Sequence, residues 1–198
     1  MLNINEHGYI IDPRVKLAIG PHLEQGPMDT VRGIIVHQTD SWTAESTLNT
    51  YRTSTVGAHL LIDKDGAVYQ TASLFKRTLH VGRLKSRCLI EQTCAPAETR
   101  ALSAMNIAAM HRHEMKKQVP QRYPANEDSI GIEIVGRALP LDVPPAKRVY
   151  EAVTPAQSAS LRWLMQALIQ QLNVPVTEVF RHSVVSYKNP TEGSTARW

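Results

Sequence analysis

The feature that most constrains the fold is a capped amphipathic helix near the C-terminal end of this 198-residue chain. Thr154 is placed as its N-cap, Pro155 occupies the first helical position, and Gln157 completes a capping box. Leucines then recur on one helical face: Leu161, Leu164, Leu168 and Leu172. Asn173 and Pro175 end the helix. The leucine face is therefore expected to pack into the hydrophobic core.

Short apolar stretches upstream of this helix predict strands. Residues 33–37 (GIIVH) and 129–136 (SIGIEIVG) are typical of buried strands. Residues 58–70 (AHLLIDKDGAVYQ) predict a hairpin around a DG turn. A short helix after a Ser/Thr cap is expected over roughly residues 43–51. Strands that alternate with helices favour an α/β fold, in which helices cover a sheet.

Residues 84–125 differ in character from the rest of the chain. They contain both cysteines, one helix expected over about 97–117, and a loose polar stretch. We interpret this segment as an insertion on a single domain that spans residues 1–198. Cys88 and Cys94 lie six positions apart and could close a small loop, although two thiols in a chain of this length more often stay free.

The charge pattern limits the classes of partner. The formal net charge is +4, but no run of Lys or Arg exceeds two residues, so no nucleic-acid-binding stripe is expected. A mild positive field favours anionic substrates, cell-wall polymers included. The N-terminus lacks a basic start followed by a long apolar run, so we expect no signal peptide, and nothing in the chain predicts insertion into a membrane.

Two of the eight histidines occupy positions that suit a metal site. His37 ends a buried strand, where side chains open into a cleft, and His182 ends a short apolar run. Zinc takes three or four N, O or S ligands and keeps one position open when it is catalytic. Two such histidines and a carboxylate from a later loop would satisfy it. Distant histidine pairs are common, however, so spacing alone leaves the question open.

Six segments in one order carry a resemblance to a known family: GIIVHQTD, VGAHLLIDKDGAVYQ, LHVG, NEDSIGIEIVG, TPAQSASLRWLMQAL and RHSVVSYKNPTEG. The chain resembles the zinc-dependent N-acetylmuramoyl-L-alanine amidases of the amidase-2 class. This class includes phage amidase-type lysozymes, anhydro-muropeptide recycling amidases and peptidoglycan recognition proteins. The resemblance implies a central mixed β-sheet flanked by helices, with one zinc ion per chain in a groove.

The resemblance also implies the zinc ligands. His37 matches the first ligand of the family and His182 the second. The third is an Asp or Cys some eight to ten positions later, where this chain has Glu192 in TEG instead of the TDPG of recycling amidases. Glutamate is a competent zinc ligand. Asn189, in an NP dipeptide that resembles DP, is the rival, but a neutral amide binds zinc poorly.

Four further residues receive roles from the same comparison. Glu133 matches the general base, and a carboxylate on a buried strand facing an activated water suits that role independently. Lys188 resembles the family lysine that stabilises the oxyanion, although here it precedes the third ligand by four positions rather than two. His80 matches a histidine that lines the groove. Together with Trp42 it is expected to bind substrate.

The function implied is hydrolysis of the amide bond between N-acetylmuramic acid and L-alanine, in degradation of the cell wall. The alternatives are a non-catalytic peptidoglycan-binding protein and a cytoplasmic anhydro-muropeptide recycling amidase. The insertion and the cysteine pair favour action in the periplasm or on the wall, after non-classical export or delivery. Peptidoglycan or a muropeptide is the expected substrate, and an immunity or regulatory protein is the protein partner to look for.

Overall fold

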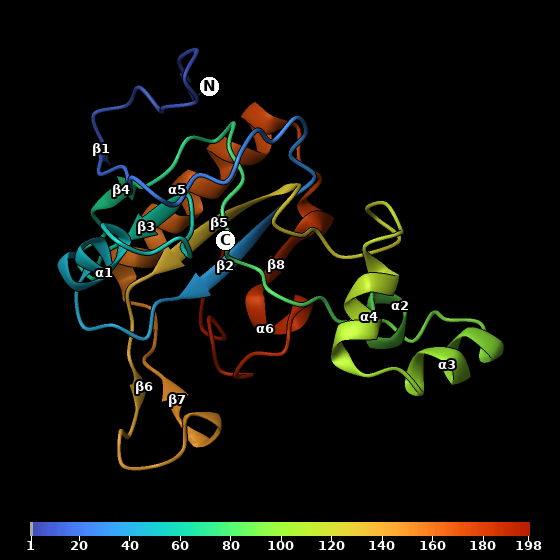
Figure 1. Cartoon of the computed structure of the whole chain (residues 1–198). Helices are drawn as coiled ribbons and strands as arrows, with labels where there is room; N and C mark the ends of the chain where they lie inside the picture. The colour runs from blue at the N-terminus through green and yellow to red at the C-terminus, as the bar shows by residue number, and fades with distance from the viewer. Residues whose placement is uncertain (1) are drawn as a thin grey trace.

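A six-stranded mixed sheet forms the centre of the computed structural model, which describes residues 2–198 (Figure 1). Its strand order is β1-β4-β3-β5-β2-β8. The strands are β1 (Val15–Leu17), β2 (Gly33–Gln38), β3 (Leu60–Ile62), β4 (Val68–Gln70), β5 (Ser129–Ile134) and β8 (Val179–Arg181). β3 and β4 form the predicted antiparallel hairpin, and the other neighbouring strands pair parallel. The predicted mixed α/β sheet flanked by helices is confirmed.

Helices flank this sheet, and a small second sheet projects from it. The helices are α1 (Ala44–Tyr51), α2 (Arg87–Ile90), α3 (Pro96–Ser103), α4 (Ile107–Glu114), α5 (Pro155–Leu172) and α6 (His182–Val185). Short 3-10 turns lie at Pro145–Lys147 and Val176–Glu178. β6 (Ala138–Leu139) and β7 (Val149–Tyr150) form the hairpin that hangs below the sheet in Figure 1. Among residues 2–198, no helix has the length and apolar character needed to cross a membrane.

The capped helix forms as predicted and covers one face of the sheet. Thr154 Oγ1 accepts the Gln157 N–H at 3.1 Å, and Gln157 Oε1 accepts the Thr154 N–H at 3.0 Å. The backbone of Asn173 is left-handed (φ 53°) and ends α5. Three of the four predicted leucines are fully buried in the main core, and Leu172 packs at its edge. That core also contains the isoleucines and valines of β2, β3 and β5 that face α5.

The face of the sheet opposite α5 carries a second set of side chains. Ile34 and Val36 of β2 pack in the α5 core, whereas Ile35 belongs to a separate cluster that includes Leu84 and Tyr123. Because successive side chains of a strand point to opposite faces, His37 shares the face of Ile35. β5 runs parallel beside β2 in a register that pairs His37 with Glu133. The face that the helix leaves open is therefore the face that holds the candidate site.

The segment 84–125 stands away from the sheet and contains three short helices (Figure 1). The single helix expected over 97–117 is wrong. The chain leaves helical geometry after Ser103, and the side chain of Asn106 starts a new helix by accepting the Ala109 N–H at 2.9 Å. Asparagine competes for backbone hydrogen bonds inside a helix and favours caps, which explains the break.

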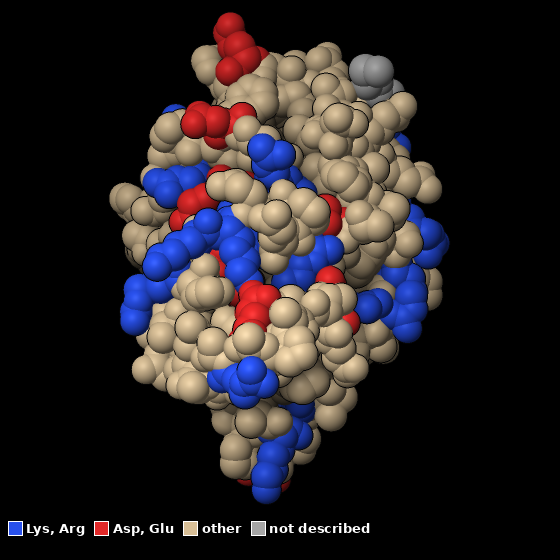
Figure 2. All heavy atoms as spheres, turned by 90° about the vertical axis from the view of Figure 1, so that its right-hand side faces the viewer, with Lys and Arg blue, Asp and Glu red and all other residues tan. Residues whose placement is uncertain are grey.

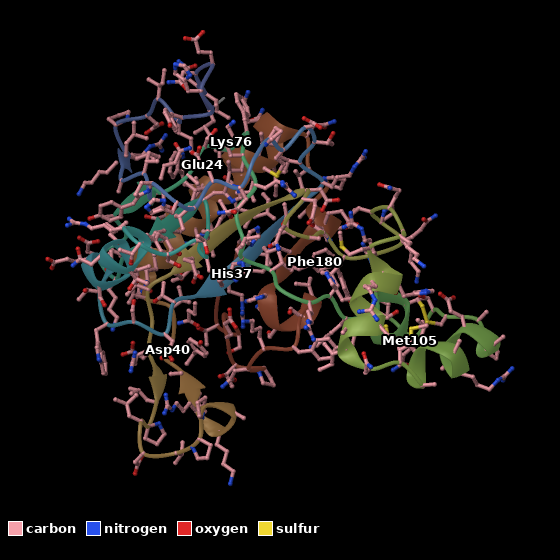
Figure 3. All side chains as sticks on the ribbon, viewed as in Figure 1. Glu24, His37, Asp40, Lys76, Met105 and Phe180 are labelled. Atoms are coloured by element: carbon pink, nitrogen blue, oxygen red, sulfur yellow. A yellow bond between two sulfur atoms is a disulfide. The ribbon has the colours of Figure 1, made fainter. Side chains whose placement is uncertain are left out.

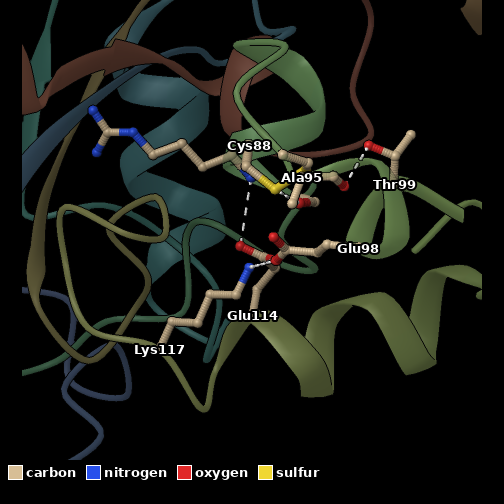
Figure 4. Close-up of a disulfide and its surroundings, with 9 residues drawn as sticks. Cys88, Ala95, Glu98, Thr99, Glu114 and Lys117 are labelled. Carbon is tan, nitrogen blue, oxygen red and sulfur yellow. Dashed lines mark hydrogen bonds and ion pairs between the residues drawn. A yellow bond between two sulfur atoms is a disulfide. The ribbon is translucent and has the colours of Figure 1, made fainter. Parts of the chain in front are cut away.

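The two cysteines of this segment are joined in a disulfide (Figure 4). The bond links the start of α2 to the loop before α3. Next to it, Lys117 bridges Glu98 and Glu114, at 3.1 and 2.9 Å, and so ties α3 to the end of α4. A covalent link and an ion-pair network therefore hold together a segment with few fully buried apolar residues.

Candidate metal and catalytic centre

His37, His182 and Glu192 converge at the carboxyl ends of β2 and β8. β2 and β8 are parallel neighbours that pair Val36 with Arg181, so the residues that follow these two, His37 in β2 and His182 at the start of α6, lie side by side. The two imidazole centroids lie 4.1 Å apart. Glu192 Oε1 lies 2.8 Å from His182 Nδ1 and 3.7 Å from His37 Nδ1. All three side chains are buried, and one ligand atom from each lies within 4.8 Å of the others.

The sequence neighbours of the three residues hold this arrangement together. The Gly193 N–H donates to Gln38 Oε1 at 2.9 Å, and Arg181 Nε donates to the Gly193 carbonyl at 2.9 Å. Gln38 follows His37, Arg181 precedes His182, and Gly193 follows Glu192. The loop that carries the carboxylate is thus attached to both strands that carry the histidines. Gly193 has a φ of +64°, which glycine adopts without strain.

Hydrogen bonds to backbone carbonyls fix which nitrogen of each ring is free. His182 donates its Nε2–H to the Val81 carbonyl at 2.8 Å, so its Nδ1 carries the lone pair. His80 donates its Nε2–H to the Ser129 carbonyl at 3.2 Å and accepts the Nε2–H of His37 at 3.0 Å. The Nδ1 of His37 is then also a lone pair. Both free nitrogens face Glu192.

This donor set fits a divalent cation such as zinc. Burial and, next, the electrostatic effect of the neighbouring His182 ring lower the pKa of His37 to about 4, so the His37 ring is neutral at physiological pH. Burial alone would raise the pKa of Glu192, but the adjacent imidazoles of His182 and His37 outweigh burial and bring it down to about 2, so this group is a carboxylate. Two imidazole nitrogens and one carboxylate, all buried, are a donor set that zinc binds.

Glu133 lies beside His37, in the adjacent position of β5. Its Oε2 is buried and has no hydrogen-bond partner among residues 2–198. Burial and, next, the negative charge of Glu192 raise the pKa of Glu133 to about 8, although Lys188 acts in the opposite direction. An unpartnered carboxyl with a pKa near neutrality is suited to proton transfer.

Lys188, expected to stabilise the oxyanion, and His80, expected to bind substrate, take different places. Lys188 is exposed in the C-terminal loop, and its positive charge lowers the pKa of both His37 and Glu133, so it lies within electrostatic range of the site. His80 is buried and contacts His37 through the hydrogen bond described above. A Cβ added to Gly131 would lie 2.7 Å from His80 Nδ1, so the glycine of the SIGIE strand makes room for this ring.

A hollow of about 340 Å³ adjoins Glu133 at the ends of β2 and β5. Hydroxyl-bearing side chains of the β2–α1 loop and α1 line much of it, together with Arg137 and Asp40. In Figure 3, His37 lies at the end of β2 and Asp40 lies towards the β6–β7 hairpin. Trp42 is half exposed near the same rim, with Lys64 Nζ and Arg137 Cζ each 5.6 Å from its ring centroid.

The structure puts Glu192, and not Asn189, beside the histidines. The side-chain amide of Asn189 donates to the carbonyls of Pro145 and Arg148 at 3.1 and 2.7 Å, and its Oδ1 accepts from Thr191. Asn189 therefore attaches the β6–β7 hairpin to the loop that carries Glu192. Its own polar atoms are fully used in this role.

Two residues near the site were missed from the sequence. Arg137 donates to the Asp40 carbonyl and lines the hollow, and Tyr150 of β7 lies within electrostatic range of Glu192 and Glu133. Burial and the charge of Glu192 raise the pKa of Tyr150, so its hydroxyl stays protonated. Arg137 directly precedes the β6–β7 hairpin and Tyr150 lies in it. The Pro-rich sequence of this hairpin has no periodic pattern that would connect it with the site.

Comparisons with known proteins show the family and the fold of the chain. The model of the Amidase_2 family, N-acetylmuramoyl-L-alanine amidase, matches residues 27–194. A crystal structure of an AmpD derivative is similar in fold, with TM-score 0.55 and 18% identity over 93% of this chain and 88% of that one. No curated protein sequence matches the chain significantly.

Two solved complexes with muropeptides are also similar in fold. AmiD from E. coli, bound to anhydro-N-acetylmuramic acid-L-Ala-D-gamma-Glu-L-Lys, has TM-score 0.54 and 16% identity over 92% of this chain and 57% of that one. AmpDh3 from Pseudomonas aeruginosa, bound to an anhydromuramic pentapeptide, has TM-score 0.52 and 18% identity over 94% and 59%.

Proposed function

Because the chain belongs to the N-acetylmuramoyl-L-alanine amidase family, we propose that it is a zinc-dependent enzyme that degrades the cell wall. The bond cleaved is the amide between the lactyl group of N-acetylmuramic acid and L-alanine of the stem peptide. The observation that carries the proposal is the convergence of two histidine lone pairs and one carboxylate beside the unpartnered carboxyl of Glu133. This combination suits hydrolysis better than binding alone.

His37, His182 and Glu192 would hold the zinc ion, one per chain. Zinc in such a site supplies Lewis-acid chemistry, which activates water and polarises an amide carbonyl. The chain itself supplies preorganisation. The Val81 carbonyl and His80 fix both rings with their Nδ1 atoms towards Glu192 before any ligand binds.

Glu133 serves as the general base and then as the general acid. Its carboxylate takes a proton from the attacking water and returns it to the nitrogen of the departing L-alanine. In the metal-free protein the pKa of Glu133 is raised to about 8, and a bound divalent cation would lower it towards neutrality, where the group can both accept and release a proton. Burial of Oε2 without a partner leaves this oxygen free for the reacting groups.

Lys188 and the hollow next to Glu133 complete the assignment. The ammonium group of Lys188 stabilises the negative charge that develops on the carbonyl oxygen of the substrate. Substrate lies along the hollow, where the hydroxyls of the β2–α1 loop offer hydrogen bonds and Trp42 offers an aromatic surface. His80, which the sequence assigns to the substrate groove, acts through His37 in this scheme, because its ring is buried against that residue.

The disulfide supports action outside the reducing cytoplasm. Disulfides form and persist in the periplasm and outside the cell, and are rare in the cytosol. We therefore assign the enzyme to the periplasm or the wall, rather than to cytoplasmic recycling of anhydro-muropeptides. An intact sacculus is then its substrate.

The test measures metal content and product release together. Purified protein should contain one zinc per chain and release free stem peptides from sacculi, detected by mass spectrometry. Chelation should abolish release and added zinc should restore it. Glu133→Gln should keep zinc but lower kcat by about 10²–10⁴-fold, whereas the exposed Glu6→Gln serves as a matched control without effect. A zinc-replete protein that releases nothing would be a peptidoglycan-binding protein and not an enzyme.

A parallel digestion separates wall degradation from recycling. The same protein is offered intact sacculi and soluble anhydro-muropeptides at equal stem-peptide concentration. Cleavage of both is expected for an enzyme that acts on the wall. Cleavage of the soluble fragments alone would refute the assignment to the wall and support recycling.

A further inference from the structure

The excess of positive over negative charge lies in one segment of the chain. Residues 84–125 contain seven Lys and Arg against three Glu and no Asp, whereas the rest of the chain contains 15 of each sign. The formal net charge of +4 therefore equals the net charge of residues 84–125, which we call the α2–α4 segment. Figure 2 looks onto this side of the molecule, where Lys and Arg side chains outnumber acidic ones.

Ion pairing leaves only cations free on this segment. Each of its three glutamates is paired, Glu91 with Arg87, and Glu98 and Glu114 with Lys117. Three exposed cations remain that form no ion pair among the described residues: Arg100, Arg112 and Lys116. Arg100 lies on α3, Arg112 lies in the last turn of α4, and Lys116 lies in the turn that follows α4. The segment therefore exposes three positive charges that no carboxylate among the described residues neutralises.

The segment is attached directly beside the candidate catalytic centre. Leu84 bridges to Ser186, and Lys85 Nζ donates to the Ser183 carbonyl at 2.6 Å. The Val81 carbonyl that fixes His182 lies just before the segment begins. The segment therefore extends from the edge of the site, on the side opposite α1 (Figure 1). A polymer that crosses the site from the hollow beside α1 would continue towards its basic helices.

We propose that the basic surface of the α2–α4 segment binds the anionic peptidoglycan polymer outside the cleaved bond and holds the enzyme on the sacculus. This inference rests on the proposed function, because it takes peptidoglycan as the substrate. Stem peptides carry free carboxylates at every repeat, so an intact sacculus presents a dense array of negative charge. A short soluble muropeptide fills the site without reaching the segment, so it gains nothing from these cations.

The ionic strength sets the distance over which these exposed cations attract an anionic polymer. The Debye length is about 30 Å at 0.01 M ionic strength and about 8 Å at 0.15 M, so the attraction is long-ranged only at low salt. Charge of one sign on a surface typically changes association by about 10- to 1,000-fold. The expected signature is salt-sensitive binding of the polymer together with salt-insensitive cleavage of the soluble fragment.

The experiment reverses the three free cations. Arg100→Glu, Arg112→Glu and Lys116→Glu are combined in one variant, and a matched variant combines Lys16→Glu, Arg32→Glu and Arg162→Glu, three exposed cations elsewhere. Both changes alter net charge equally. Binding is measured by pelleting with sacculi in a Glu133→Gln background, at low and physiological salt, and circular dichroism checks the fold. Active forms are assayed on sacculi and on a soluble muropeptide.

The proposal predicts that the segment variant binds sacculi about tenfold more weakly at low salt and loses most of the salt dependence. Its kcat/KM on the soluble muropeptide should equal that of the wild type, and the matched variant should bind as the wild type does. Equal binding by the segment variant and the wild type would overturn the proposal. So would equal losses in both variants, or a loss on the soluble substrate. A wild-type protein that pellets with sacculi but cleaves nothing contradicts the proposed function, and weaker pelleting of the segment variant alone would then still support the binding surface.

Discussion

Replacement of Glu133 by glutamine is expected to stabilise the metal-free protein near neutral pH while it removes activity. Burial and the charge of Glu192 raise the pKa of Glu133 from 4.5 to about 8. Between these values the unfolded chain releases a proton that the folded protein retains, so stability falls as pH rises through this window. This pKa shift lowers the free energy of unfolding at about pH 7 by about 3 kcal/mol relative to low pH. Screening by water in the adjoining hollow makes the loss smaller, so about 1–3 kcal/mol is expected.

Urea unfolding of chelator-treated protein measures this effect. The free energy of unfolding is determined for the wild type and for Glu133→Gln at about pH 4 and about pH 7. Glutamine does not titrate, and all other groups are common to both proteins, so the change in their stability difference isolates Glu133. Glu6→Gln provides an exposed control. Identical pH dependence in the wild type and the Glu133 variant would show that this carboxyl ionises normally in the folded protein, and would refute the reasoning.

Three further predictions concern the metal site and the disulfide. Glu192→Gln should weaken zinc binding by about 100-fold or more in a competition assay with a chromogenic chelator; unchanged affinity would exclude this residue as a ligand. Gly131→Ala should weaken zinc binding about tenfold, because the new Cβ displaces His80; a normal affinity would show that His80 does not orient the site. Removal of Cys88 and Cys94 as serines should lower the free energy of unfolding by about 2 kcal/mol, seen in thermal melts, because their loop is short; an unchanged melting temperature would contradict this.

The elements that depend on local chemistry were predictable from the sequence. The capping box at Thr154 and Gln157 and the apolar strands at 33–37 and 129–136 form where the pattern indicates. Each of these signals is carried by residues close together in the chain. The break at Asn106 shows the limit of such signals, because one cap residue divided a stretch that otherwise resembled a single helix.

The candidate site depended on the resemblance to a family as much as on local pattern. His37, Glu133 and His182 are far apart in the chain, and only the parallel register of β5, β2 and β8 places them side by side. The choice between Glu192 and Asn189 also needed the tertiary structure. Asn189 turns away to hold the β6–β7 hairpin, which has no signature in the sequence.

The sequence by itself determined the α/β pattern, the caps, and which residue types were available for metal binding and proton transfer. The tertiary structure alone decided which lone pairs face one another, because backbone carbonyls from distant segments set the histidine tautomers. It also decided that Glu133 lies within electrostatic range of Glu192, and that every glutamate of the α2–α4 segment is paired. Hydrogen bonds, burial and ion pairs join atoms distant in the chain, so they exist only once the chain has folded. A net charge of +4 could be counted from the sequence, but its free cations could be identified only in the folded protein.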